Sequence, residues 1–287
     1  MDRRSELGDF LRSRRARRQP EDLGLIPVGG RRRVPGLRRE ELAQAAALSV
    51  DYYVRLEQGR LRNPSAEVVD AVATALGLDS AERRYLHNLA RPQRPAQSPA
   101  YPAVPTTVQT LLDNMQVPAA LFTKRADILA WNPLAAALIT DFGALPPEQR
   151  NMARLVFLND EVAARFVDWE AKARDLVSQL RIAASRSPGD ERIATLVGEL
   201  SMRSTEFARL WATHPVREKV RGGHRYRHPI VGEFYLRYEA FSVPDESDLS
   251  LVCQVADPGS PDEEALRLLA SWTAESARHE RVNAQLR

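Results

Sequence analysis

Three consecutive arginines, Arg31 to Arg33, are the side chains of this chain with the plainest chemistry. Guanidinium groups neutralise phosphates and enter narrow minor grooves, so such a run predicts contacts with nucleic acid. The alternative is a solvated charged segment, the usual state of a like-charged run. Arg60 and Arg62, which follow a two-helix motif that begins after the run, are further candidate phosphate partners. Their position around this motif favours nucleic-acid binding.

The motif covers residues 37–59 and has the apolar spacing of two short helices joined by a tight turn. The residues expected to form its shared core are Leu42, Ala43, Ala46, Leu48, Tyr53 and Leu56. Ala47 occupies the turn, and the hydroxyl of Ser49 is placed to cap the second helix. A second helix held in this way fits the major groove of double-stranded DNA. The stretch therefore predicts a DNA-binding protein.

Charge is distributed unevenly along the chain. Residues 1–98 carry 19 arginines and 13 acidic residues, a net charge of +6, whereas the remainder carries −3. A basic first third attached to a mildly acidic remainder suits a polyanionic partner.

Length and composition limit the class of protein. The chain has 287 residues, of which 44% are hydrophobic, enough for two domains with a buried core. No apolar run approaches the ~20 residues that span a bilayer, and the first residues lack the apolar core of a signal peptide. The single cysteine, Cys253, excludes an internal disulfide. We expect a cytoplasmic protein without a membrane partner.

Signatures of catalysis are missing from the sequence. We find no phosphate-binding glycine loop, nucleophile elbow, HExxH or CxxC pair, so we expect no enzyme, no cofactor and no metal. His224 and His228 leave a metal site as the weaker alternative, because residues four apart on a strand share a face.

Apolar periodicity divides the chain into two parts joined by a proline-rich segment. Five short helices are expected at 5–17, 38–47, 50–58, 65–76 and 80–90. The second part combines helices at 107–115, 133–141, across 148–213 and after Pro261 with strands at 119–124, 127–131, 225–228, 233–242 and 249–256. We predict an α+β protein, with an all-α domain at 1–91, a linker at 92–106, and a domain with an antiparallel sheet at 107–287.

Residues 37–59 resemble the helix-turn-helix of the Cro/C1-type, or xenobiotic-response-element, repressors. The marks are LAQAA at 42–46, the Leu48–Ser49 pair, and RLEQG at 55–59. The resemblance implies that the second helix, opened by Ser49, places Val50, Asp51 and Arg55 at base edges. These would meet a thymine methyl, a cytosine amino group and a guanine, respectively. Tyr52 and Arg39 would contact phosphates.

Two residues of the motif need a structural explanation. Glycine is common at the position of Ala47, because the turn residue often has positive φ, and alanine there costs about 1 kcal/mol. Glu57 is expected to pair with an arginine of the fold, Arg14 or Arg38, rather than with DNA.

Separated phrases of the second part resemble the MmyB-like regulators, which couple this motif to a PAS-like ligand-binding domain. The phrases are PAALFTKRADILAWNPLAAAL at 118–138, MRSTEFARLW at 202–211, RHPIVGEFYLRYEAF at 227–241 and DPGSPDEEALRLLASW at 257–272. The resemblance implies a homodimeric transcription factor whose second domain binds a small apolar, fatty-acid-like ligand.

Aromatic and polar residues of the second part are candidates to line that ligand site, since such sites combine an apolar wall with a few polar groups. The candidates are Trp131, Asn132, Phe157, Trp169, Arg181, Phe207, Trp211, His228 and Tyr235. Arg181 could pair with a carboxylate. The alternatives are that the aromatic residues only build a core and that Asn132 caps the helix that begins at Pro133.

A protein-interaction module, or a PAS-like domain that only dimerises, is the alternative to an effector-binding regulator.

Overall fold

The computed structural model describes residues 3–24, 36–61, 64–91, 103–217, 221–243 and 246–285. The chain forms two compact units. The first comprises Met1–Ala96, Arg181–Gly198 and Arg209–Glu218, and the second comprises Gln97–Leu180, Glu199–Ala208 and Lys219–Arg287. The arginine run Arg31 to Arg33 and Arg62 lie outside the described residues.

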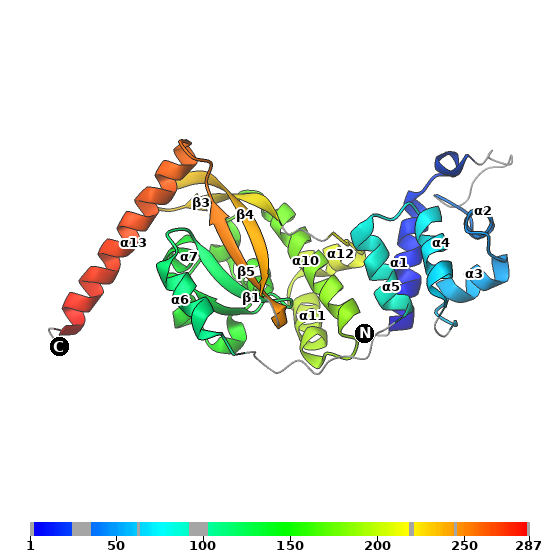
Figure 1. Cartoon of the computed structure of the whole chain (residues 1–287), viewed down its shortest axis with the longest axis horizontal. Helices are drawn as coiled ribbons and strands as arrows, with labels where there is room; N and C mark the ends of the chain where they lie inside the picture. Colours follow the sequence, from blue (N-terminus) through cyan, green and yellow to red (C-terminus); the bar gives the residue numbers. More distant parts are fainter. Residues whose placement is uncertain are drawn as a thin grey trace. The chain divides into compact units, whose positions relative to one another are not determined.

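The first unit contains the five short helices that the sequence predicts (Figure 1). They are α1 (Arg3–Arg17), α2 (Arg39–Ala45), α3 (Val50–Glu57), α4 (Ala66–Ala75) and α5 (Ser80–Ala90), with a short 3-10 turn, η1 (Pro20–Leu23). One buried cluster holds them together, and Phe10 of α1 meets Tyr85 of α5 edge to face at 4.9 Å between ring centroids. All six residues expected in the motif core are buried or partly buried in this cluster.

Further along the chain, helices α10 (Trp169–Arg186), α11 (Glu191–Arg203) and α12 (Thr205–Ala212) follow. The segments of these helices from Arg181 to Gly198 and from Arg209 belong to the first unit. Ile182 and Val216 pack against the same apolar cluster as α1 to α5. The first unit is therefore built from stretches that are far apart in sequence.

The second unit contains an antiparallel five-stranded sheet, which confirms the expected α+β fold (Figure 1). Its strands are β1 (Ala119–Thr123), β2 (Ile128–Trp131), β3 (Arg221–His228), β4 (Gly232–Val243) and β5 (Glu246–Val255), in the order β2-β1-β5-β4-β3. Helix α6 (Thr106–Asn114) buries Val108 and Leu112 against Leu121 on one face.

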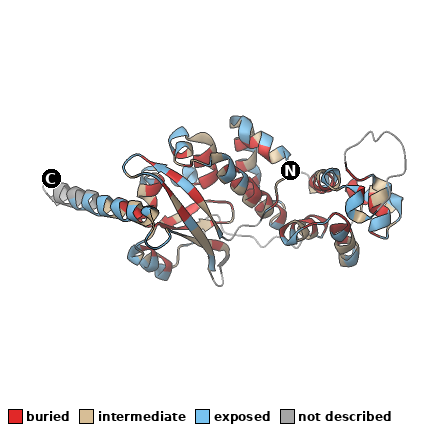
Figure 2. Cartoon of the chain, turned by 90° about the horizontal axis from the view of Figure 1, so that it is seen from above, coloured by how far each residue is buried: buried red, intermediate tan, exposed pale blue. Residues whose placement is uncertain are grey.

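The opposite face carries the larger core, visible as buried residues between sheet and helices in Figure 2. It packs against α7 (Pro133–Leu138), α8 (Met152–Leu158), α9 (Asp160–Ala164) and α13 (Pro261–Gln285), with short 3-10 turns η2 (Phe142–Ala144) and η3 (Pro147–Gln149) between α7 and α8. Among the helices that the structure describes, none is long and apolar enough to cross a membrane.

Strand β3 begins at Arg221, four residues before the predicted start, so that prediction was wrong. Gly222 and Gly223, which precede the predicted strand, lie within the observed one and pair with Tyr238 and Arg237 of β4. A Cβ at Gly223 would collide with the hydroxyl of Tyr235, so the glycine leaves room for that aromatic side chain.

Candidate DNA-binding surface and ligand-binding core

The turn between α2 and α3 has the geometry expected from the sequence. Ala47 adopts a left-handed conformation with φ 54°, and the amide of Leu48 donates to the carbonyl of Ala43 at 2.9 Å. The hydroxyl of Ser49 accepts from the amide of Tyr52 at 3.2 Å and so caps α3. The predicted turn conformation and helix cap are confirmed.

The first turn of α3 points outward. Val50, Asp51 and Arg55 are exposed, and 41% of Val50 is accessible although its side chain is apolar. Tyr52 is half-buried at the edge of this face, and Arg60 is exposed just after the helix. The three residues assigned to base edges therefore share one exposed face.

The opposite side of α3 is anchored by a buried acid, Glu57. Its carboxylate is fully buried and accepts hydrogen bonds from Arg15 at 2.9 Å, Arg39 at 2.8 Å and the hydroxyl of Tyr53 at 2.9 Å. Burial alone would raise the pKa of Glu57, but the hydrogen bonds from these partners outweigh burial and lower it. We call Glu57, Arg15, Arg39 and Tyr53 the Glu57 cluster; it fixes α3 against α1 and α2.

The structural role expected for Glu57 is confirmed, whereas both expected partners were wrong. Arg14 instead pairs with Glu82 of α5 at 2.7 Å, and Arg38 precedes α2 with its amide bonded to Glu41. Arg39, assigned to a phosphate, is held by Glu57 while 42% of its side chain stays accessible. It is therefore both oriented by the fold and open to a partner.

Several ligand candidates meet in the second unit. Phe157 of α8 contacts the rings of Trp169 and Phe207 edge to face, at centroid distances of 5.6 and 5.1 Å. The indole nitrogen of Trp169 donates to the carbonyl of Val156 at 3.0 Å. Trp131 packs into the same core from β2, against Phe142. These residues form an apolar wall on the face of the sheet that packs against α7, α8, α9 and α13.

The polar candidates of this unit are engaged by the fold. The side-chain oxygen of Asn132 accepts from the amides of Ala135 and Ala119, and its nitrogen donates to the carbonyl of Val117, so the helix-capping alternative is confirmed. His228 is buried and its Nε2 bonds the carbonyl of Ala137 at 3.0 Å. Tyr235 alternates with Phe234 along β4 and therefore faces away from Trp131. In the part of the chain that the structure describes, no three metal-binding side chains converge.

Arg181 and Trp211 lie apart from the other candidates, in the first unit. The guanidinium of Arg181 is buried over the ring of Trp211, 4.1 Å from its centroid, and donates to the carbonyl of Trp211. It also pairs with Glu6 of α1, whose carboxylate accepts from the hydroxyl of Tyr85 at 2.6 Å. His214 completes this group, 2.9 Å from Arg181 and 3.3 Å from Glu6. We call Glu6, Tyr85, Arg181 and His214 the Glu6 cluster.

Sequence reasoning missed the Glu6 cluster. Glu6 and Arg181 are 175 residues apart, and an acid in a first helical turn or an arginine on a long helix usually lies in solvent. His214 has a left-handed φ of 49° in the structure, but nothing in the surrounding sequence indicates this conformation. Burial alone would raise the pKa of Glu6, but the contacts with His214, Arg181 and Tyr85 lower it to about 2.

Comparison with known proteins agrees with this geometry. The MmyB-like transcription regulator ligand binding domain matches residues 104–269, more than half of the chain. A helix-turn-helix domain matches residues 6–86, which include α2 to α4 and most of α1 and α5. No curated protein matches the chain. The chain belongs to the MmyB-like transcription regulators and carries a DNA-binding helix-turn-helix domain ahead of the ligand-binding domain of that family.

Proposed function

We propose that this regulator is a homodimer that reads a DNA operator of two half-sites and responds to a small apolar, fatty-acid-like effector. The observation that carries the proposal is the outward face of α3, where Val50, Asp51 and Arg55 are exposed on a capped helix. This helix lies within the matched helix-turn-helix domain. Each protomer supplies one such helix to one half-site.

The assigned contacts follow from side-chain chemistry. Arg55 binds a guanine through two hydrogen bonds, Asp51 accepts from a cytosine amino group, and Val50 contacts a thymine methyl. Phosphate contacts position the helix without reading sequence. The residues assigned to the phosphates of the DNA backbone are Arg31, Arg32, Arg33, Arg39, Tyr52 and Arg60.

Selection from a random pool of DNA duplexes tests this part of the proposal. The selected sequences are expected to contain two related half-sites whose centres lie about 10 base pairs, or a multiple of that, apart. Recovery of duplexes without a common sequence, or of a single half-site, would contradict a dimeric reader.

The effector is assigned to the apolar wall of the second unit, which belongs to the matched ligand-binding domain. Phe157 lies at the centre of its aromatic contacts. Titration with myristate, followed by tryptophan fluorescence, is expected to saturate. Phe157→Leu should weaken binding about tenfold, the loss of roughly one aromatic contact, whereas Ile230→Ala on an exposed turn should leave it unchanged. If neither myristate nor a shorter saturated fatty acid binds, the effector assignment is wrong.

A further inference from the structure

Helix α1 connects the two buried ionic clusters of the first unit. Glu6, near its start, belongs to the Glu6 cluster, and Arg15, near its end, belongs to the Glu57 cluster. Nine residues separate them, about 13 Å along a helix. One rigid element therefore carries a buried ion pair at each end.

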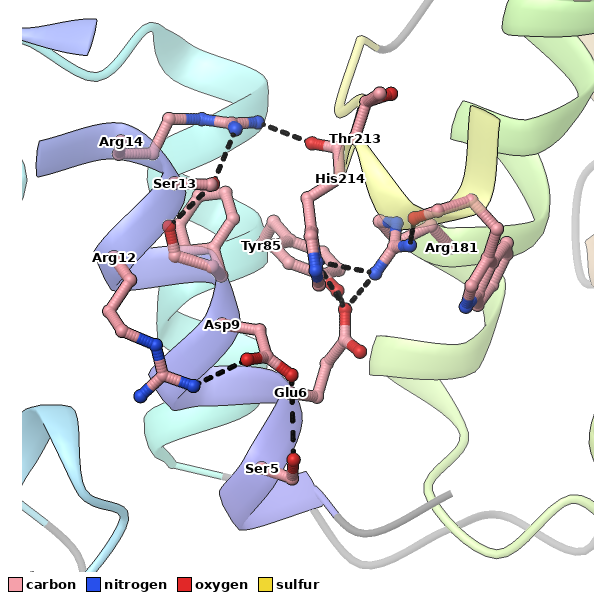
Figure 3. A network of polar contacts seen from close by, with 12 residues as sticks. Ser5, Glu6, Asp9, Arg12, Ser13, Arg14, Tyr85, Arg181, Thr213 and His214 are labelled. Atoms are coloured by element: carbon pink, nitrogen blue, oxygen red, sulfur yellow. Dashed lines mark hydrogen bonds and ion pairs between the residues drawn. The ribbon is translucent and has the colours of Figure 1, made fainter. Parts of the chain in front are cut away.

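Residues from the other stretches of the first unit hold α1 at both Glu6 and its C-terminal turn. Arg181 pairs with Glu6 and His214, and the carbonyl of His214 accepts from Arg14 of α1 at 2.8 Å (Figure 3). Arg17, one turn further along α1, donates to the carbonyl of Thr213 at 3.2 Å. These contacts fix α1 at several points, with Glu6 and Arg181 as the buried pair of opposite charges.

The C-terminal end of α1 also holds the recognition helix. Arg15 pairs with Glu57, the last residue of α3, at 2.9 Å. Between the two clusters, the backbone of α1 approaches α3 so closely that a Cβ at Gly8 would lie 2.5 Å from the carbonyl oxygen of Glu57. A displacement of α1 is therefore transmitted to α3, because packed backbone has no free space to absorb it.

Arg181 stands at the position where the chain passes from the second unit to the first, within helix α10. Leu180, the preceding residue, belongs to the second unit and is fully buried. Any rearrangement that moves this part of α10 acts directly on Arg181.

We propose that Arg181 is a positioning residue for the recognition helix. Through Glu6 it fixes α1, and α1 fixes α3 through Gly8 and the Arg15–Glu57 pair. The inference rests on the proposed function for the role of α3 in reading DNA, and it names how that role is regulated: a change along α10 alters the placement of α3. The required coupling is a difference in free energy between two arrangements of α1.

Hydrogen exchange of backbone amides in the full chain tests the proposal without DNA or effector. Arg181→Met is expected to speed exchange in α3 about tenfold while exchange in α4 stays within about twofold of the wild type. The matched control is Arg174→Met, an exposed arginine on the same helix that pairs with Glu170. This control variant should leave amide exchange unchanged in both α3 and α4.

The double variant Glu6→Gln/Arg181→Met guards against simple unfolding, because removing both charges leaves no lone buried ion. It is expected to keep the fold and to show α3 exchange as fast as in Arg181→Met, since the two residues act through one contact. The proposal is overturned if α3 exchange is unchanged in the folded variants, or if α3 and α4 accelerate equally. Because this readout needs no DNA, it separates failure of the inference from failure of the proposed function.

Discussion

Replacing Glu57 by glutamine tests whether the buried carboxylate anchors α3. The side chain of Glu57 is fully buried and pairs with Arg15, which is 13% exposed, and Arg39, which is 42% exposed. Glutamine keeps the size but removes the negative charge and turns an NH₂ group toward guanidinium donors. Arg15 is then left largely buried without its counter-ion.

The magnitude follows from the burial of the partners. Removing one member of a buried ion pair costs about 3–5 kcal/mol. Because Arg39 is nearly half exposed and water screens its pair, we take the lower end, a loss of about 3 kcal/mol in the free energy of unfolding.

Urea denaturation followed by circular dichroism measures this loss at neutral pH. The control is Glu40→Gln, an exposed acid of α2, for which a change of at most about 0.5 kcal/mol is expected. A loss below about 1 kcal/mol for Glu57→Gln, or one equal to that of the control, would show that the carboxylate is not an anchor.

Three further predictions concern local structure and pH. Ala47→Gly should raise the free energy of unfolding by about 0.5–1 kcal/mol, because relief of the left-handed alanine outweighs the entropy of glycine; a loss in urea denaturation would contradict this. Asn132→Ala should cost about 2–3 kcal/mol in the same assay, since it removes the cap of α7 and leaves the buried amide of Ala119 without its partner; a loss of a few tenths would refute it. Glu6 and Glu57 have lowered pKa values, so their ion pairs stabilise the fold fully above about pH 4.3, the value of a glutamate in the unfolded chain, and lose this contribution as the pH falls below it. For Glu6 the loss extends down to its folded-state pKa of about 2. Thermal unfolding should show stability falling over that range, and falling less steeply in Glu6→Gln than in the wild type.

Features that depend on neighbouring residues were predictable from the sequence. Ser49 and Asn132 cap helices that begin one residue later, and the residue type together with the following apolar pattern is enough to assign them. The positive φ of Ala47 follows from the tight turn between two helices.

Features that depend on how the helices pack against one another were not predictable from the sequence. Arg14 and Arg15 are adjacent on α1 and differ by about 100° around the helix axis, so the rotation of α1 against α3 decides which one reaches Glu57. Sequence cannot fix that rotation. Arg181 was assigned to a ligand carboxylate, and the structure places it against the carboxylate of Glu6 instead. Arg181 does pair with a carboxylate, as predicted, but that carboxylate belongs to a residue 175 positions away in the chain.

The most direct test of the central claim, that the first turn of α3 reads base pairs, is the affinity of Arg55→Ala for a selected duplex and for a scrambled one. Fluorescence anisotropy at fixed salt measures both. We expect the ratio of the two affinities to fall about tenfold or more, because one bidentate contact with guanine supplies about 1–3 kcal/mol of discrimination. Arg203→Ala, on an exposed position of α11, should leave the ratio unchanged. An unchanged ratio in Arg55→Ala would contradict the assignment of α3 as the reading helix.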